Sequence, residues 1–309
     1  MFFLSAVLLI LGIVIVGFGS QLIVDSSLHL AQKLKLSGIA LGAIFIAVVT
    51  AMPETFITLL ALRKSQVLAF GNLVGSNILN IPVAIGLPAL FTILCFSKFA
   101  KRISLIMLLS AALSFLLLLD GRLTSLEGWL LILCYLIYVI YVIKKEKNNY
   151  QELEIKEYSN LKTAILFLIG ATLLLLGSYL LVESSLDIVK QVGVSELYIG
   201  ATVVAFGSIV SEFSVSLSAI IKKQCSIAIG NILGDNIFTM LVVLGLVGIL
   251  RPLSVTKRDL YLSILPIIFI TGVLFLMTSK KDKTIGKREG LILLIAYGII
   301  LLLQTLFIK

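Results

Sequence analysis

Charged residues are scarce in this sequence of 309 residues. Only 13% of the chain is Asp, Glu, Lys or Arg, whereas 60% is apolar. A typical soluble domain has about 25% charged and about 45–50% apolar residues. A water-soluble fold could not bury this much apolar surface, so we expect lipid to be the solvent for most of the chain. This composition excludes a cytosolic enzyme, a secreted domain and a nucleic-acid-binding protein.

Side chains for thiol or imidazole chemistry are equally few. The single histidine, His29, cannot build a zinc site. The three cysteines, Cys95, Cys134 and Cys225, are an odd number and include no CxxC pair. We therefore expect no thiol redox chemistry, no bound transition metal and no tightly bound cofactor.

Long apolar stretches are what the chain has instead. A helix of about 20 residues crosses roughly 30 Å of hydrocarbon, and ten stretches are long enough. They lie at about residues 3–31, 38–62, 67–94, 103–119, 125–143, 161–188, 197–221, 226–249, 259–278 and 289–308. The sequence therefore predicts an all-α polytopic membrane protein with ten transmembrane helices. The first stretch is too long for a signal peptide, so we expect it to be the first span.

Positive charges are concentrated in alternate loops. If the N-terminus is outside, most of the 25 Lys and Arg residues lie in the loops predicted to be inside. This distribution follows the positive-inside rule and accounts for the net charge of +9 without a polyanionic partner. We expect a multi-pass protein of the cytoplasmic membrane with both termini outside.

The second half of the chain repeats the first at an offset of 158 residues. Residues 24–27 read VDSS and residues 182–185 read VESS, while Glu54 matches Glu212. Further on, one extra residue changes the offset to 159. So many identical small and polar positions are hard to attribute to chance, and they indicate an internal duplication.

Five predicted spans in each half insert the second half upside down relative to the first. Inverted repeats of this kind are common in secondary transporters, which hold their ion site near the bilayer midplane between the halves. We predict a first five-helix repeat at 1–143, a charged cytoplasmic linker at 144–160 and a second five-helix repeat at 161–309.

Three acidic residues lie deep inside apolar stretches: Glu54, Glu212 and Asp235. An unpaired carboxylate there costs about 3 kcal/mol or more. The same stretches offer no Lys or Arg, so a cation or a proton is the expected partner. Pro53 should open the helix before Glu54, and Gly207 should allow unwinding near Glu212. Backbone carbonyls freed in this way are hard oxygen ligands.

Polar side chains at four-residue spacing accompany the carboxylates on the third and eighth predicted spans. They are Asn72, Ser76 and Asn80 on one face of the third, and Asn231, Asp235 and Thr239 on the matching face of the eighth. Such an oxygen-rich shell suits calcium better than a transition metal. Two glutamates neutralise one divalent ion or two sodium ions, so one site can hold either in turn.

The two motifs resemble the alpha-repeats of the cation/calcium exchanger superfamily, most closely those of prokaryotic sodium/calcium exchangers. They comprise residues 42–54 with 71–77, and residues 200–212 with 230–236. The resemblance extends over nearly the whole chain. It implies ten spans in two inverted halves, with the first and sixth spans sliding as a gate across a more rigid core.

The resemblance also implies the ion ligands. Calcium is implied at the side chains of Glu54 and Glu212 with the backbone of Thr50 and Ser208, and sodium at Ala47, Ala205, Ser76 and Asn80.

Several positions depart from the family pattern, which usually reads Gly-Thr/Ser-Ser-x-Pro-Glu in both repeats. The replacements are Val49 for glycine, Ala51 and Ile209 for the second hydroxyl, and Ser211 for proline. In the eighth span, Asp235 and Thr239 stand where the family usually has Ser and Asp. The carboxylate has thus moved back by one helical turn. We expect a retained divalent site, with Asp235 and Thr239 beside it, and altered sodium sites.

The sequence therefore predicts a secondary active antiporter, not an enzyme, that exchanges calcium or a similar divalent cation for sodium by alternating access. The expected partners are inorganic cations (Ca²⁺ and Na⁺, or H⁺) and the lipid bilayer, and a monomer is compatible with the sequence. A divalent cation/proton exchanger of the same fold and a non-transporting cation-binding relative remain open. A membrane-embedded enzyme fits poorly because nothing supplies a nucleophile with its base.

Overall fold

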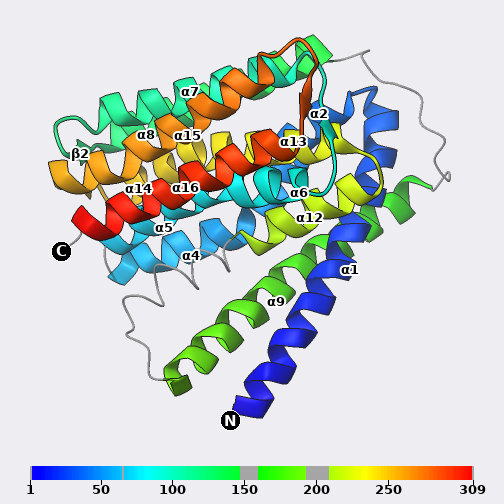
Figure 1. The fold of residues 1–309 in the computed structure, drawn as a ribbon, viewed down its shortest axis with the longest axis horizontal. Helices are drawn as coiled ribbons and strands as arrows, with labels where there is room; N and C mark the ends of the chain where they lie inside the picture. The colour runs from blue at the N-terminus through cyan, green and yellow to red at the C-terminus, as the bar shows by residue number, and fades with distance from the viewer. Residues whose placement is uncertain (1, 65, 147–158, 193–208, 308–309) are drawn as a thin grey trace.

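The computed structural model describes residues 2–64, 66–146, 159–192 and 209–307, and helices form nearly all of them (Figure 1). In the first half the helices are α1 (Phe2–Leu34), α2 (Gly38–Leu41), η1 (Gly42–Ile46), α3 (Ala47–Thr50), α4 (Met52–Lys64), α5 (Gln66–Ile81), η2 (Pro82–Gly86), α6 (Leu87–Ala89), α7 (Ala100–Leu117) and α8 (Ser125–Glu146). In the second half they are α9 (Asn160–Val192), α12 (Val210–Ile221), α13 (Cys225–Phe238), η4 (Thr239–Val243), α14 (Leu244–Leu250), α15 (Lys257–Thr278) and α16 (Lys287–Phe307).

The predicted class of an all-α polytopic membrane protein is confirmed, but the number of spans is not. Among the described residues, seven helices are long and apolar enough to cross a membrane, or eight if one bent pair forms a single span. The predicted seventh stretch, 197–221, lies partly outside the described residues, and only its end is seen, as α12. The tenth stretch forms the 21-residue helix α16, which is not one of the seven.

The second predicted stretch is a broken helix. α2, η1 and α3 follow one another with helical backbone angles at their junctions, and the chain then bends by 42° at Ala51 before α4 begins. Pro53 follows two residues later and has no N–H to donate to the carbonyl of Val49. The predicted opening of the helix before Glu54 is therefore confirmed.

The long helices α1 and α9 pack against each other in opposite directions, and together they run obliquely to the other helices and extend beyond them (Figure 1). Gly12 lies against Gly177, and Gly19 lies against Gly170. An offset of 158 carries Gly12 to Gly170 and Gly19 to Gly177, so each glycine contact is the repeat equivalent of the other. The two helices are therefore repeat equivalents that run in opposite directions.

Two short strand pairs, which the sequence did not predict, also join the halves. β1 (Leu94–Cys95) pairs antiparallel with β4 (Thr284–Ile285), and β2 (Arg122–Leu123) pairs antiparallel with β3 (Leu253–Ser254). An offset of 159 places β1 at the position of β3. Because β1 and β2 belong to the first half of the chain and β3 and β4 to the second, each strand pair links the two halves.

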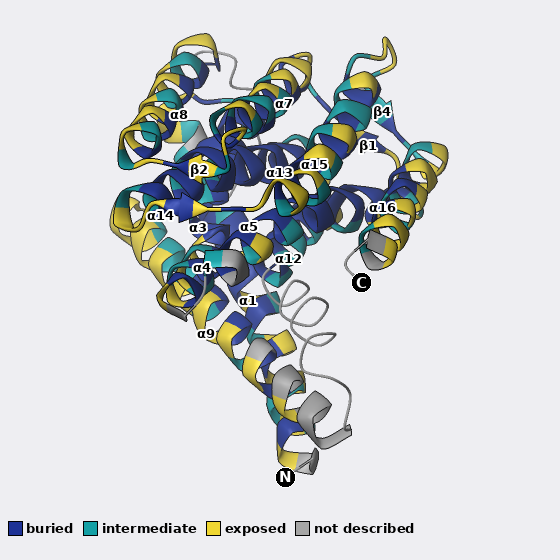
Figure 2. Cartoon of the chain, turned by 90° about the vertical axis from the view of Figure 1, so that its left-hand side faces the viewer, coloured by how far each residue is buried: buried dark blue, intermediate teal, exposed yellow. Residues whose placement is uncertain are grey.

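Apolar side chains cover both the interior and much of the outer surface. Figure 2 shows the buried residues gathered on the central helices, including α13, and exposed residues along the outer faces of helices such as α8, α9 and α16. Phe18, Leu168 and Leu302 are each more than 60% exposed. Such a surface is costly in water and matches a lipid environment.

Candidate functional site

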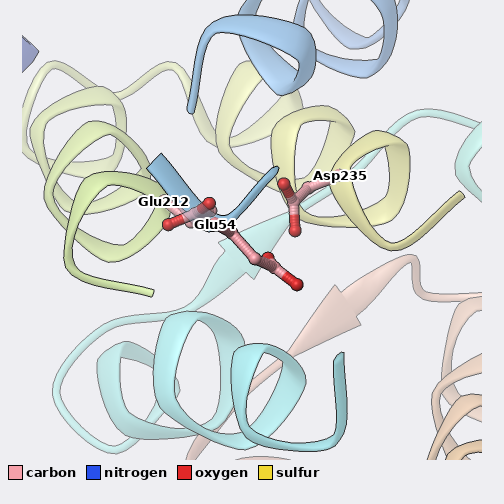
Figure 3. A group of neighbouring side chains, drawn as sticks. All are labelled: Glu54, Glu212 and Asp235. Carbon is pink, nitrogen blue, oxygen red and sulfur yellow. The ribbon is translucent and has the colours of Figure 1, made fainter. Parts of the chain in front are cut away.

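Three carboxylates from three different helices meet in the buried centre of the bundle. Glu54 lies on α4, Glu212 on α12 and Asp235 on α13 (Figure 3). One oxygen atom from each lies within 4.8 Å of the other two. All three side chains are 1% exposed or less. Residues that are 181 positions apart in the sequence thus form one acidic cluster.

Helix ends place two of these carboxylates. Glu54 is the third residue of α4, directly after the break at Ala51, and Glu212 is the third residue of α12. The free N–H groups and the dipole of a helix N-terminus favour negative charge. In both repeats the glutamate therefore lies in the first turn of a helix, whereas Asp235 lies in the interior of α13.

The groups that donate hydrogen bonds to the three carboxylates among the described residues are uncharged. The Ser76 hydroxyl donates to Glu54 Oε1, Asn80 Nδ2 donates to Asp235 Oδ2 at 2.7 Å, and Ser211 Oγ donates to Glu212 Oε2 at 2.8 Å. Within the described part of the chain, no Lys or Arg forms an ion pair with any of them. A cation or a proton therefore remains the expected partner of these carboxyl groups.

Some oxygen atoms of the site have no partner among the described residues. These are Glu212 Oε1 and Asp235 Oδ1, together with the amide oxygen of Asn80. Buried polar atoms are normally hydrogen-bonded, and those that are not need an explanation such as an ion. The described part of the site offers carboxylate, amide and carbonyl oxygens, which suit a hard cation.

One amide–hydroxyl bond in each half lies beside the site. Asn72 Nδ2 donates to Thr58 Oγ1 at 3.0 Å, and Asn231 Nδ2 donates to Ser216 Oγ at 3.2 Å. The two bonds are repeat equivalents. Thr58 and Ser216 were not predicted from the sequence, although each lies four residues after its glutamate, on the same face of the helix.

The helices α5 and α13 are joined by further side-chain bonds. Asn77 Nδ2 donates to Thr239 Oγ1 at 2.8 Å, and Asn80 Nδ2 donates to Asn236 Oδ1 at 3.0 Å. The Thr239 hydroxyl in turn donates to the backbone oxygen of Asp235 at 2.9 Å. Thr239 therefore joins the two helices, and its hydroxyl forms these bonds with an amide and with backbone oxygens.

The remaining predicted ligands lie beside the cluster or outside the described residues. The Thr50 carbonyl accepts a bond from Ser211 Oγ at 2.9 Å, and the Thr50 hydroxyl donates to Asn231 Oδ1 at 3.0 Å. Ala47 is fully buried one turn earlier in the same helix. Ser208 and Ala205 lie outside the described residues. The roles of all these residues as ligands stay predictions.

The sequence matches one protein family in both halves. The model of that family, described as sodium/calcium exchanger protein, matches residues 4–144 and again residues 162–306. Similar curated proteins include a putative antiporter, CaxA, of Alkalimonas amylolytica, which is 30% identical over 95% of this chain and 96% of its own length. The sodium/calcium exchanger MaX1 of Methanosarcina acetivorans is 26% identical over 94% of this chain and 95% of its own.

The fold is also similar to solved structures. One is the sodium-calcium exchanger NCX_Mj, soaked with Na⁺ and Sr²⁺. It superposes with a TM-score of 0.84 at 26% identity, over 97% of this chain and 99% of that one. The similarity in sequence and the similarity in fold therefore both extend over nearly the whole length of this chain.

Proposed function

We propose a function from one premise, that this chain belongs to the sodium/calcium exchanger protein family. It is a secondary active antiporter that exchanges calcium, or a similar divalent cation, for sodium by alternating access. The observation that carries this proposal is the buried cluster of Glu54, Glu212 and Asp235, whose hydrogen-bond donors among the described residues are uncharged.

Coupling follows from the charge of the site. Glu54 and Glu212 together balance one divalent ion or two sodium ions, and the same oxygen atoms cannot hold both sets at once. An empty, negatively charged cluster is costly to carry across a hydrocarbon interior. The protein therefore changes its facing direction readily only when cations fill the site, and this condition couples the two ion flows.

In this proposal the ligands come from both repeats. The divalent ion is held by the carboxylates of Glu54, Glu212 and Asp235 and by the carbonyls of Thr50 and Ser208. Sodium ions are held near Ala47, Ala205, Ser76 and Asn80, with Thr239 at the edge of the site. We further propose that the repeats are residues 1–143 and 161–309.

The membrane setting belongs to the same proposal. The protein resides in the cytoplasmic membrane with both termini outside, and the linker at 144–160 lies in the cytoplasm. The distribution of Lys and Arg among the loops supports this orientation.

A divalent cation/proton exchanger is the second candidate. Ala51 and Ile209 stand where the family resemblance implies hydroxyl groups that help to bind sodium. Asp235 also adds a third carboxylate beside the two glutamates. Protons can satisfy carboxylates without the hydroxyl ligands that sodium needs, so these two features favour this alternative over a non-transporting relative.

Calcium-45 uptake into proteoliposomes under imposed ion gradients tests the proposal. We expect an outward sodium gradient to drive calcium uptake above the level without a gradient, and a potassium gradient to have no effect. If only a proton gradient drives calcium uptake, the coupling ion is the proton and not sodium. No uptake under any gradient would contradict the assignment as an antiporter.

A further inference from the structure

The Ser211 hydroxyl lies between two groups that the proposed function assigns to the divalent ion. Ser211 Oγ is 2.9 Å from the backbone oxygen of Thr50 and 2.8 Å from Glu212 Oε2. Thr50 ends α3 in the first half, whereas Ser211 and Glu212 begin α12 in the second. All three side chains are fully buried.

A serine hydroxyl has one hydrogen, so Ser211 can donate to only one of these acceptors at a time. Rotation about its C–O bond would transfer the hydrogen bond from the Thr50 carbonyl to the Glu212 carboxylate. Each acceptor that receives this hydrogen has a lone pair occupied and a positive partial charge beside it. A cation approaching the same oxygen atoms meets a competitor.

The Ser211 hydroxyl does not cap the N-terminus of its own helix, α12. α12 is preceded by Ile209 at the N-cap position, where no side-chain capping bond is seen, and the bonds of Ser211 go to Thr50 and to its neighbour Glu212. The equivalent position in the first repeat is Pro53, which has no polar hydrogen at all. The competing donor is therefore present in only one of the two repeats.

We propose that Ser211 is a positioning residue that lowers the affinity of the site for divalent cations and so promotes their release. Its hydroxyl donates to Thr50 O or to Glu212 Oε2 while the site is without a divalent ion, and the oxygen atom that accepts this bond is a weaker ligand for the ion. This inference rests on the proposed function, because it takes Thr50 O and Glu212 as divalent ligands.

Calcium binding to the purified full-length protein, measured by titration calorimetry, tests the inference with four proteins. They are the wild type and three variants. Ser211→Ala and Ser211→Gly lack the Ser211 hydroxyl, and Ser218→Ala removes a different serine hydroxyl two turns further along α12. Removing a competing hydrogen bond of ordinary strength should tighten calcium binding about fivefold in both Ser211 variants. Ser218→Ala should bind as the wild type does.

The possible results distinguish a failure of this inference from a failure of the proposed function. Ser211 variants that bind calcium as the wild type does, or more weakly, overturn the inference while the proposed site stands. A purely structural bond between α12 and α3 would lower the thermal midpoint of the Ser211 variants and leave calcium affinity unchanged, which also overturns it. If none of the four proteins binds a divalent ion, the proposed function fails and the inference fails with it.

Discussion

Glu54 shows how one residue can identify a membrane transport site. Its carboxylate lies at the start of α4, is 1% exposed and is bonded to the Ser76 hydroxyl. No cationic side chain in the described part of the chain balances it. Because the free energy of an unbalanced carboxylate in a membrane interior is high, the ligand itself must supply the positive charge.

Replacing Glu54 with glutamine tests this role. Glutamine keeps the shape and can still accept the bond from Ser76, but it removes a negative charge. Loss of about 3 kcal/mol of interaction with a buried ion should reduce calcium uptake about a hundredfold, with the protein still folded. Glu127→Gln, a helix-end carboxylate on α8, is the control and should transport normally. Undiminished uptake by Glu54→Gln would remove Glu54 from the site.

Asp235 and Thr239 differ in what they contact, although they lie one turn apart on α13 and η4. Asp235 belongs to the acidic cluster, and Thr239 accepts a bond from Asn77 on α5. The family resemblance implies serine and aspartate at these two positions.

The double substitution Asp235→Ser with Thr239→Asp restores that arrangement and keeps the number of carboxylates unchanged. We expect exchange to become more dependent on sodium, measured as calcium uptake across a series of sodium gradients. The same sodium dependence in the variant and in the wild type would mean that the position of this carboxylate does not set the coupling ion.

At the residue scale, the sequence was informative where burial and polarity conflict. Glu54, Glu212 and Asp235 could be selected because charged residues inside apolar stretches are rare. The bonds from Ser211 to Thr50, and from Asn72 and Asn231 to Thr58 and Ser216, could not be predicted. They depend on how helices distant in the sequence are packed, and serine and threonine are ordinary residues in membrane helices.

Close helix packing holds the elements that carry the site. Gly230 and Gly234 on α13 lie against the backbone of α2 and η1, and a Cβ added at Gly234 would be only 2.2 Å from the carbonyl oxygen of Ala43. Backbone atoms cannot move aside as a flexible side chain can. Glycine at this position therefore allows α13 to bring Asp235 near Glu54.

Gly234→Ala should separate these helices. We expect a loss of about 1–3 kcal/mol or more in stability, seen as a lower thermal midpoint in detergent, together with weaker calcium binding. Gly272→Ala on α15 is the matched control, because a Cβ there meets no described atom within 4 Å. Equal thermal midpoints for the two variants would show that the contact with Ala43 has little energetic weight.

At the scale of elements, the break before α4 could be predicted because proline has a direct steric effect. The π-helical segments η1, η2 and η4 and the two short strand pairs could not be predicted. π-Helical turns are rare and occur mostly as single turns inside α-helices, and two-residue strands such as β1 and β2 give no periodic pattern to detect.

The duplication organises the whole molecule. The reciprocal contacts of α1 with α9 follow the offset found in the sequence, and the strand pairs join the two halves. The repeat was predictable because identical small and polar residues recur in register. The predicted number of spans is not confirmed, because only the described residues can be counted and the predicted span at 197–221 lies partly outside them.

The proposed orientation can be tested by labelling single cysteines from one side of the membrane. In a variant without Cys95, Cys134 and Cys225, a cysteine introduced by Ser159→Cys should react with an impermeant thiol reagent only from the inside. Asp120→Cys, at the opposite end of the bundle, should react only from the outside. The reverse pattern would invert the topology, and labelling of both from one side would contradict the odd number of spans between them.

The most direct test of the account is the position of a bound divalent ion. Crystals of the full chain soaked with strontium should give one strong anomalous peak between the carboxylates of Glu54, Glu212 and Asp235, and this peak should be absent in Glu54→Gln. A peak elsewhere in the molecule, or one that persists unchanged in that variant, would contradict the claim that this cluster carries the transported ion.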